Sequence, residues 1–170
     1  VVTGVCHAVQ AAMADYYRQF HLYFLKGEDD SELKTASDLK EKLAAIPWKG
    51  NFFKRLTLST YTNYTIQQEA TAPAMQVLRK EMKAAYPDGV LPQQLRHDFR
   101  MASLPLMKYT NILSFNWRTI ALFTSILACM PWLYFAFEFI VLNIILIYMI
   151  ARHERICKDF TKRIQNGQYK

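Results

Sequence analysis

The longest apolar run of the chain predicts a membrane hairpin. Residues 117–151 carry only two charged side chains, Arg118 and Glu138, and a basic cluster follows directly. A membrane-spanning helix needs about 20 mainly apolar residues, so the run is too long for a single span. Pro131 interrupts it near its middle. The pattern therefore predicts two transmembrane helices over residues 111–151, joined by a tight turn.

The beginning of the chain predicts the end of a further transmembrane helix, over residues 1–25. Its small residues Gly4, Ala8 and Ala12 repeat every four positions. This spacing places them on one helix face, where a neighbouring helix can approach closely in lipid. The alternative is an alanine-rich helix without such a neighbour. Because the chain opens inside an apolar stretch, we expect it to be a piece of a longer protein.

Residues 26–110 are polar and mostly helical by pattern. A first helix, capped by Asp30 or Ser31, is expected to end before Pro47, because proline disfavours helix in the residue that precedes it. A second helix is predicted to start at Pro73.

Two other stretches of this region give weaker signals. A short helix is predicted over residues 93–102, ending ahead of Pro105. Residues 56–72 are ambiguous, because their threonines and tyrosines favour a strand by propensity while the flanking segments are helical.

The distribution of charge predicts the topology. Basic residues are concentrated after the apolar run, at Arg152, Arg155, Lys158, Lys162, Arg163 and Lys170. Such flanks stay in the cytoplasm, whereas the turn at Pro131 has no charge. We therefore expect a cytoplasmic insertion over residues 26–110 and a basic cytoplasmic tail over residues 152–170. The predicted fold is an all-α integral membrane bundle with about three transmembrane helices.

Composition limits the classes of partner and site. The net charge is +7, but the basic residues that flank the last span explain it by attraction to an anionic leaflet. A nucleic-acid partner is not expected. The three cysteines, Cys6, Cys129 and Cys157, lie in different segments and predict neither a disulfide framework nor a zinc site.

Two polar residues of the apolar run are candidates for a buried site. A charge near the bilayer centre costs at least about 2.5 to 3.5 kcal/mol, so Glu138 should face a partner helix, a cavity or the interface. A functional role and an interfacial position both remain open for it. Asn143 lies five positions further on, about 140° around an α-helix. We expect the two residues to lie on different faces, with Asn143 in an interhelical hydrogen bond.

Three basic residues near the membrane surface are candidates for binding anionic substrates. The Arg118 guanidinium can bind phosphate bidentately or extend to the lipid head groups. Arg18 and Lys108 lie close to the same surface. The four histidines are scattered without metal-ligand spacing, and no nucleophile motif is present.

Three stretches of the chain resemble one family. They are ADYYRQFHLYFLKG at residues 14–27, SLPLMKYTNIL at residues 103–113 and MPWLYF at residues 130–135. They are similar to the C-terminal half of bacterial CDP-alcohol phosphatidyltransferase family proteins that have a long cytoplasmic insertion. The signature of that family, D-x-x-D-G-x-x-A-R followed by G-x-x-x-D-x-x-x-D, is absent. The Asp88-Gly89 pair lies in a polar turn and does not match it.

The resemblance implies a function for the parent protein. Such an enzyme moves a phospho-alcohol group from a CDP-alcohol to a hydroxyl acceptor in phospholipid biosynthesis and releases CMP. Its signature aspartates hold divalent metal, Mg or Mn, so no catalytic or metal residue is expected in this chain. Arg18, Lys108 and Arg118 would attract the anionic substrates.

The resemblance also implies a location and partners. The parent would be a multi-pass protein of the inner (cytoplasmic) membrane, in contact with membrane lipids and with further N-terminal transmembrane helices, and a homodimer is compatible with it. The alternative is a non-enzymatic membrane scaffold or accessory subunit with a cytoplasmic interaction domain.

Overall fold

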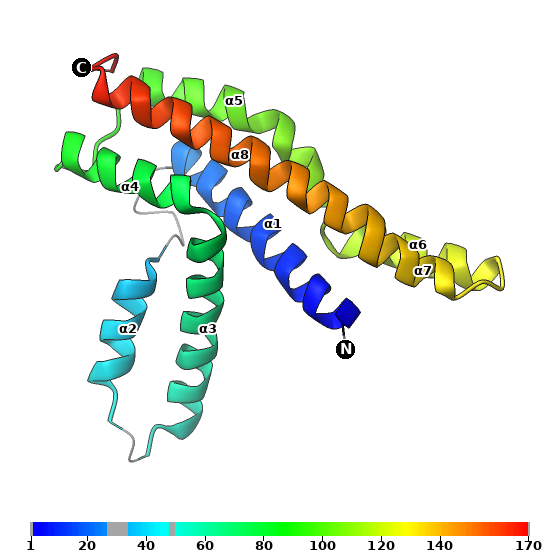
Figure 1. Ribbon diagram of the computed structural model, residues 1–170. Coiled ribbons are helices and arrows are strands. Elements are labelled where there is room, and N and C mark those ends of the chain that lie inside the picture. The colour runs from blue at the N-terminus through cyan, green and yellow to red at the C-terminus, as the bar shows by residue number, and fades with distance from the viewer. Residues whose placement is uncertain (1, 27–33, 48–49, 170) are drawn as a thin grey trace.

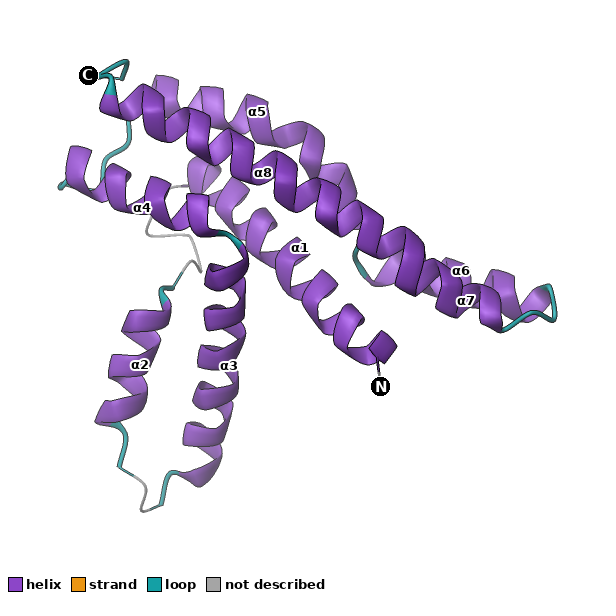
Figure 2. Ribbon diagram, viewed as in Figure 1, coloured by secondary structure: helices purple, strands orange, loops and turns teal. Residues whose placement is uncertain are grey.

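The computed structural model describes residues 2–26, 34–47 and 50–169, and all regular elements in these ranges are helices (Figures 1 and 2). The elements are α1 (Val2–Lys26), α2 (Ala36–Ala45), α3 (Phe52–Thr71), α4 (Pro73–Ala85), α5 (Gln93–Ile112), α6 (Phe115–Leu127), α7 (Trp132–Ala136), the π-helical turn η1 (Phe137–Val141) and α8 (Leu142–Gln165). The prediction of an all-α fold is confirmed for the described residues.

The centre of the fold is a bundle in which α1 and α4 both pack on α8, and α5 packs on α1 and α8. Figure 1 shows α6 and α7 extending past the end of this bundle, on the side where α1 begins. The α2–α3 hairpin projects away from the bundle in another direction. One face of each of the helices α1, α5 and α8 therefore points toward the centre of the bundle.

Aromatic side chains fill the core between these three helices. The rings of Phe24 and Phe99 stack at 3.9 Å between centroids, and Phe20 meets Phe99 edge to face at 5.3 Å. All three are fully buried. Tyr17 stacks on His153 at 4.1 Å in the same region. Aromatic rings bury large areas, and offset or edge-on pairs add to that gain, so this cluster joins α1, α5 and α8.

The segment with the ambiguous pattern is helical and forms most of α3. Several of its threonine hydroxyls donate to the carbonyl four residues earlier. Examples are Thr57 to Phe53, Thr60 to Leu56, Thr62 to Leu58 and Thr65 to Tyr61. These bonds satisfy the hydroxyls within the helix, so the strand propensity of threonine does not decide the structure.

The helix expected ahead of Pro47 is α2, and it begins later than its pattern suggested. Thr35 caps α2 through a capping box with Asp38, and the helix ends ahead of Pro47, as predicted. The expected caps, Asp30 and Ser31, lie outside the described residues. Helix α4 begins at Pro73, also as predicted.

The predicted end of a helix ahead of Pro105 is wrong, because α5 continues through this proline. Proline removes one backbone donor and bends a helix, and Figure 1 shows a bend in α5. Buried side chains lie on both sides of it, with Ser103 before and Leu106 after. Packing against α1 and α8 therefore holds the helix together across the missing hydrogen bond.

One helix among the described residues is long and apolar enough to cross a membrane. It is the continuous helix Trp132–Gln165, and most of its apolar part is not covered by the rest of the chain. The hairpin partner α6 has 13 residues, which span about 20 Å at 1.5 Å per residue. That length is less than the hydrocarbon core of a bilayer, about 30 Å.

The hairpin of α6, α7, η1 and α8 presents a broad apolar surface. Its exposed large side chains include Phe115, Trp117, Ile120, Phe123, Ile126, Leu127, Trp132, Phe135, Phe139, Ile140, Ile144 and Ile147. Contiguous apolar surfaces of this kind mark contact with a membrane or a partner.

Candidate functional site

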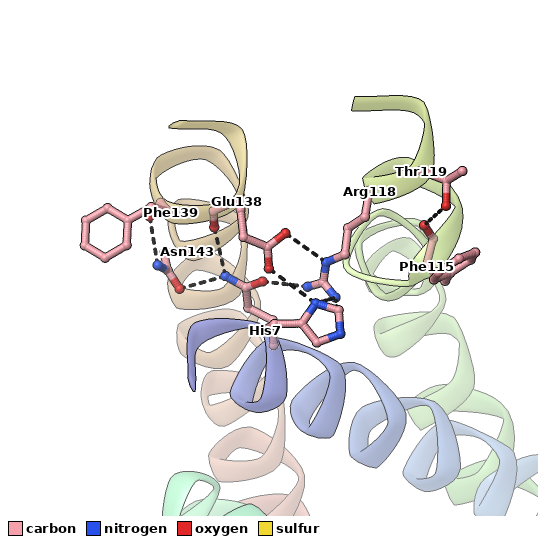
Figure 3. Close-up of polar contacts among 8 residues, drawn as sticks. His7, Phe115, Arg118, Thr119, Glu138, Phe139 and Asn143 are labelled. Carbon is pink, nitrogen blue, oxygen red and sulfur yellow. Dashed lines mark hydrogen bonds and ion pairs between the residues drawn. The ribbon is translucent and has the colours of Figure 1, made fainter. Parts of the chain in front are cut away.

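A buried polar cluster lies where α1, α6 and η1 meet. Arg118 is 4% exposed, Glu138 1% and Gln10 0%. Figure 3 shows Arg118 and Glu138 pointing toward each other from neighbouring helices, with the ring of His7 beside them. The cluster is thus enclosed at the base of a hairpin whose outer surface is apolar.

An ion pair forms the centre of this cluster. Arg118 Nε lies 3.2 Å from Glu138 Oε2. Neither carboxylate oxygen of Glu138 accepts a well-aligned hydrogen bond from the described residues. Removing both charges from water is costly, and close pairing offsets part of that cost. Arg118 therefore points into the protein and does not extend to the lipid head groups.

Gln10 connects all the helices of the cluster. Its side-chain oxygen accepts a hydrogen bond from Arg118 Nη2 at 2.6 Å. Its amide nitrogen donates to Asn143 Oδ1 at 2.9 Å and to the backbone carbonyl of Glu138 at 3.2 Å. A single amide thus fixes α1 against α6 and η1, and it leaves no side-chain polar atom of its own unpaired.

His7 forms the open side of the cluster. Arg118 Nη1 donates to His7 Nδ1 at 2.8 Å. Because a guanidinium only donates, Nδ1 is the acceptor and carries no proton in this arrangement. Its 3.4 Å contact with Glu138 Oε1 is then not a hydrogen bond. The His7 side chain is 48% exposed, so it is the member of the cluster that a ligand reaches first.

The prediction that Glu138 and Asn143 lie on different faces is wrong. Phe137–Val141 form a π-helical turn, in which the Leu142 N–H bonds the carbonyl of Phe137, five residues earlier. A π-turn brings residues i and i+5 into line, so Glu138 reaches His7 while Asn143 reaches Gln10 on the same helix, α1. The expected interhelical hydrogen bond of Asn143 is confirmed.

The three basic candidates do not form one site. Arg118 belongs to the buried cluster. Arg18 Nη2 donates to Asn111 Oδ1 at 3.2 Å, at the end of α5. Lys108 is exposed, with its Nζ 4.9 Å from the centroid of the Tyr109 ring.

Two residues of the cluster, His7 and Gln10, were not predicted from the sequence. Their signal was present, because both are polar residues inside the apolar first half of α1.

The face of α1 that carries the small residues is not packed as expected. Gly4 and Ala8 are exposed, whereas Ala12 is buried.

The cluster does not fit a divalent metal. It offers one carboxylate, that of Glu138, which is already paired with Arg118. Across the described residues, no three His, Cys, Asp or Glu side chains are arranged to hold a metal ion.

Comparison of the chain with known protein families, with curated proteins and with solved structures finds no match.

Proposed function

We propose that this chain is the C-terminal part of a membrane transferase related to the CDP-alcohol phosphatidyltransferases. The parent protein would move a phospho-alcohol group from a CDP-alcohol to a hydroxyl acceptor and release CMP. The similarity of residues 14–27, 103–113 and 130–135 to that family supports the proposal, as does the all-helical fold with its membrane-spanning candidate.

The observation that carries the proposal is the buried Arg118–Glu138 pair, in a hairpin that has no other charged residue between positions 117 and 151. Charged residues at this depth are costly and mark substrate pathways and functional sites. A guanidinium is suited to bidentate contact with phosphate oxygens. In this proposal Glu138 positions Arg118, and an anionic substrate group approaches the guanidinium from the side of the half-exposed His7.

The remaining architecture follows from the same proposal. Helix α1, the α6 arm and the helix Trp132–Gln165 would be three closing helices of a larger bundle in the inner membrane, with the C-terminus in the cytoplasm. Preceding helices would cover the exposed face of α1 at Gly4 and Ala8 and supply the metal-binding aspartates. Arg18 and Lys108 would attract anionic substrates at the membrane surface.

A direct test uses the full-length gene product in native membranes. Release of CMP from CDP-alcohols is measured in the presence of Mg²⁺. The coding sequence upstream of Val1 is determined separately. The proposal expects the signature D-x-x-D-G-x-x-A-R on a preceding apolar helix and CMP release that depends on a hydroxyl acceptor. Absence of both would overturn it.

The role of the cluster is tested by removing both of its charges at once. The double variant Arg118→Met/Glu138→Met leaves no unpaired buried charge, so the protein should stay folded. We expect a loss of at least 10-fold in CMP release. The matched control, Arg79→Met/Glu69→Met, removes another interhelical pair, which is 3.9 Å apart, and should retain activity.

A second candidate is a non-enzymatic scaffold or accessory subunit. It is favoured by the contacts of Arg118, whose guanidinium already interacts with Glu138, Gln10 and His7 and so joins α1 to the hairpin. Under this alternative the Arg118→Met/Glu138→Met protein remains folded and no CMP is released even by the unmodified protein.

A further inference from the structure

A second polar site lies at the opposite end of α8 from the buried cluster. A surface cavity of about 360 Å³ opens between α5 and α8, and three arginines of α8 line it, at Arg152, Arg155 and Arg163. The apolar side chains of Ala102 and Phe160 also line it. A cavity of this size accommodates a phosphate-bearing head group.

The acidic residues of this cavity are already engaged. Asp159 Oδ2 lies 2.7 Å from Arg163 Nη2. Asp98 Oδ2 accepts a hydrogen bond from the Tyr169 hydroxyl at 3.2 Å. Arg152 and Arg155 are exposed and, within the part of the chain that the structure describes, form no ion pair with a carboxylate. Two guanidinium groups therefore remain available for an anion.

The position of these two arginines along α8 indicates where the anion comes from. Ile144, Tyr148, Arg152 and Arg155 follow one another at spacings of four, four and three residues, which places them on one helix face. Ile144 is 62% exposed and Tyr148 49%. This face changes from apolar to basic within about one helical turn, as expected where a helix leaves the hydrocarbon of a bilayer.

We propose that the cavity binds the phosphate of an anionic phospholipid whose acyl chains lie along Ile144 and Tyr148. Arginine matches phosphate oxygens with its planar fork of donors, and basic pockets on the cytoplasmic side of membrane helices bind lipid head groups. The proposal needs α8 to enter the membrane but does not depend on the transferase reaction. Lipid binding and CMP release are separate measurements, so the two proposals can fail independently.

The test is native mass spectrometry of the full-length protein, taken from nanodiscs that contain phosphatidylglycerol, cardiolipin or phosphatidylcholine. We expect one anionic lipid to be retained per chain and phosphatidylcholine to be lost. The variant Arg152→Gln/Arg155→Gln should lower retention by about 10-fold or more. The variant Arg152→Lys/Arg155→Lys keeps the charge and should fall in between, because lysine lacks the bidentate geometry.

A matched control removes the same charge from exposed positions of α8 that do not line the cavity. Lys158→Gln/Lys162→Gln should retain the lipid. Equal losses in the control and in the arginine variant would overturn the proposal in favour of diffuse surface attraction. The proposal would also be overturned if millimolar inorganic phosphate released the lipid and bound the protein equally well in the absence of a membrane. That outcome would identify the cavity as a site for free phosphate.

Discussion

Glu138 and Asn143 are five residues apart, yet both direct their side chains toward α1. The π-helical turn Phe137–Val141 makes this arrangement possible, because a regular α-helix would separate them by about 140°. As a result Gln10 bonds both the backbone of Glu138 and the side chain of Asn143. Single π-turns inside α-helices are frequent at functional sites, and here the turn builds the polar cluster.

Deleting one residue of this turn should leave the cluster in place. Removing Ile140 would restore α-helical geometry and set Glu138 and Asn143 four residues apart, about 40° around the helix, so both could still face α1. We expect little loss of thermal stability in nanodiscs. The contrasting variant inserts one alanine after Ile140, which is 54% exposed. Six residues of α-helix would set Glu138 and Asn143 about 240° apart, so this variant should lose the cluster and much of its thermal stability. Equal effects of deletion and insertion would contradict the role of the π-turn.

The buried ion pair should show strong coupling in a double-mutant cycle. Arg118→Met or Glu138→Met alone leaves the other charge buried and uncompensated, which typically costs about 3 to 5 kcal/mol. The double variant removes both charges and should regain most of that free energy of unfolding. Denaturant or thermal unfolding measures the three values. Simple additivity would show that the two charges do not interact.

Replacing Gln10 should lower the stability of the protein more than the size of this side chain suggests. Gln10→Leu leaves Arg118 Nη2 and Asn143 Oδ1 without the hydrogen bonds that Gln10 supplies, and each unsatisfied buried group costs roughly 1 to 3 kcal/mol. We expect loss of thermal stability and faster proteolysis at the start of α1. Gln19→Leu, a partly buried glutamine of the same helix, is the matched control and should be nearly neutral.

The cap of α2 should make this helix sensitive to acid. The hydrogen bond with Thr35 lowers the pKa of Asp38 below its usual value. A carboxyl with a lower pKa in the folded state stabilises the helix above the pKa of the unfolded chain, about 3.9. This stabilisation is lost as the pH falls through the lower, folded value.

Amide hydrogen exchange in α2 measures this effect. Protection should fall in acid for the unmodified protein, and Asp38→Asn should remove that dependence. Thr35→Ala should destabilise the helix by about 1 kcal/mol at neutral pH. Unchanged protection in Thr35→Ala would mean that packing against α3, and not the cap, holds α2 in place.

The sequence was sufficient for the features that depend on local patterns. Apolar periodicity and proline positions predicted helices, including the start of α4 at Pro73 and the end of α2 ahead of Pro47. The charge gradient along residues 117–170 indicated which end of the last helix leaves the apolar region. These features follow from hydrophobicity and backbone sterics, which act over a few neighbouring residues.

Tertiary packing decided the features where local rules conflict. Pro105 does not end α5, because Ser103 and Leu106 on either side of it are buried and α5 packs on α1 and α8. Residues 56–71 are helical despite their threonines, with Thr62, Thr65 and Gln68 buried. Gln68 Nε2 donates to the Ala12 carbonyl of α1 at 2.8 Å, so packing on α1 supports this helix. The partner of Arg118 could not be read from the chain, because Gln10 and Glu138 lie far from it in sequence and meet it only when α1 closes on a hairpin that contains a π-turn.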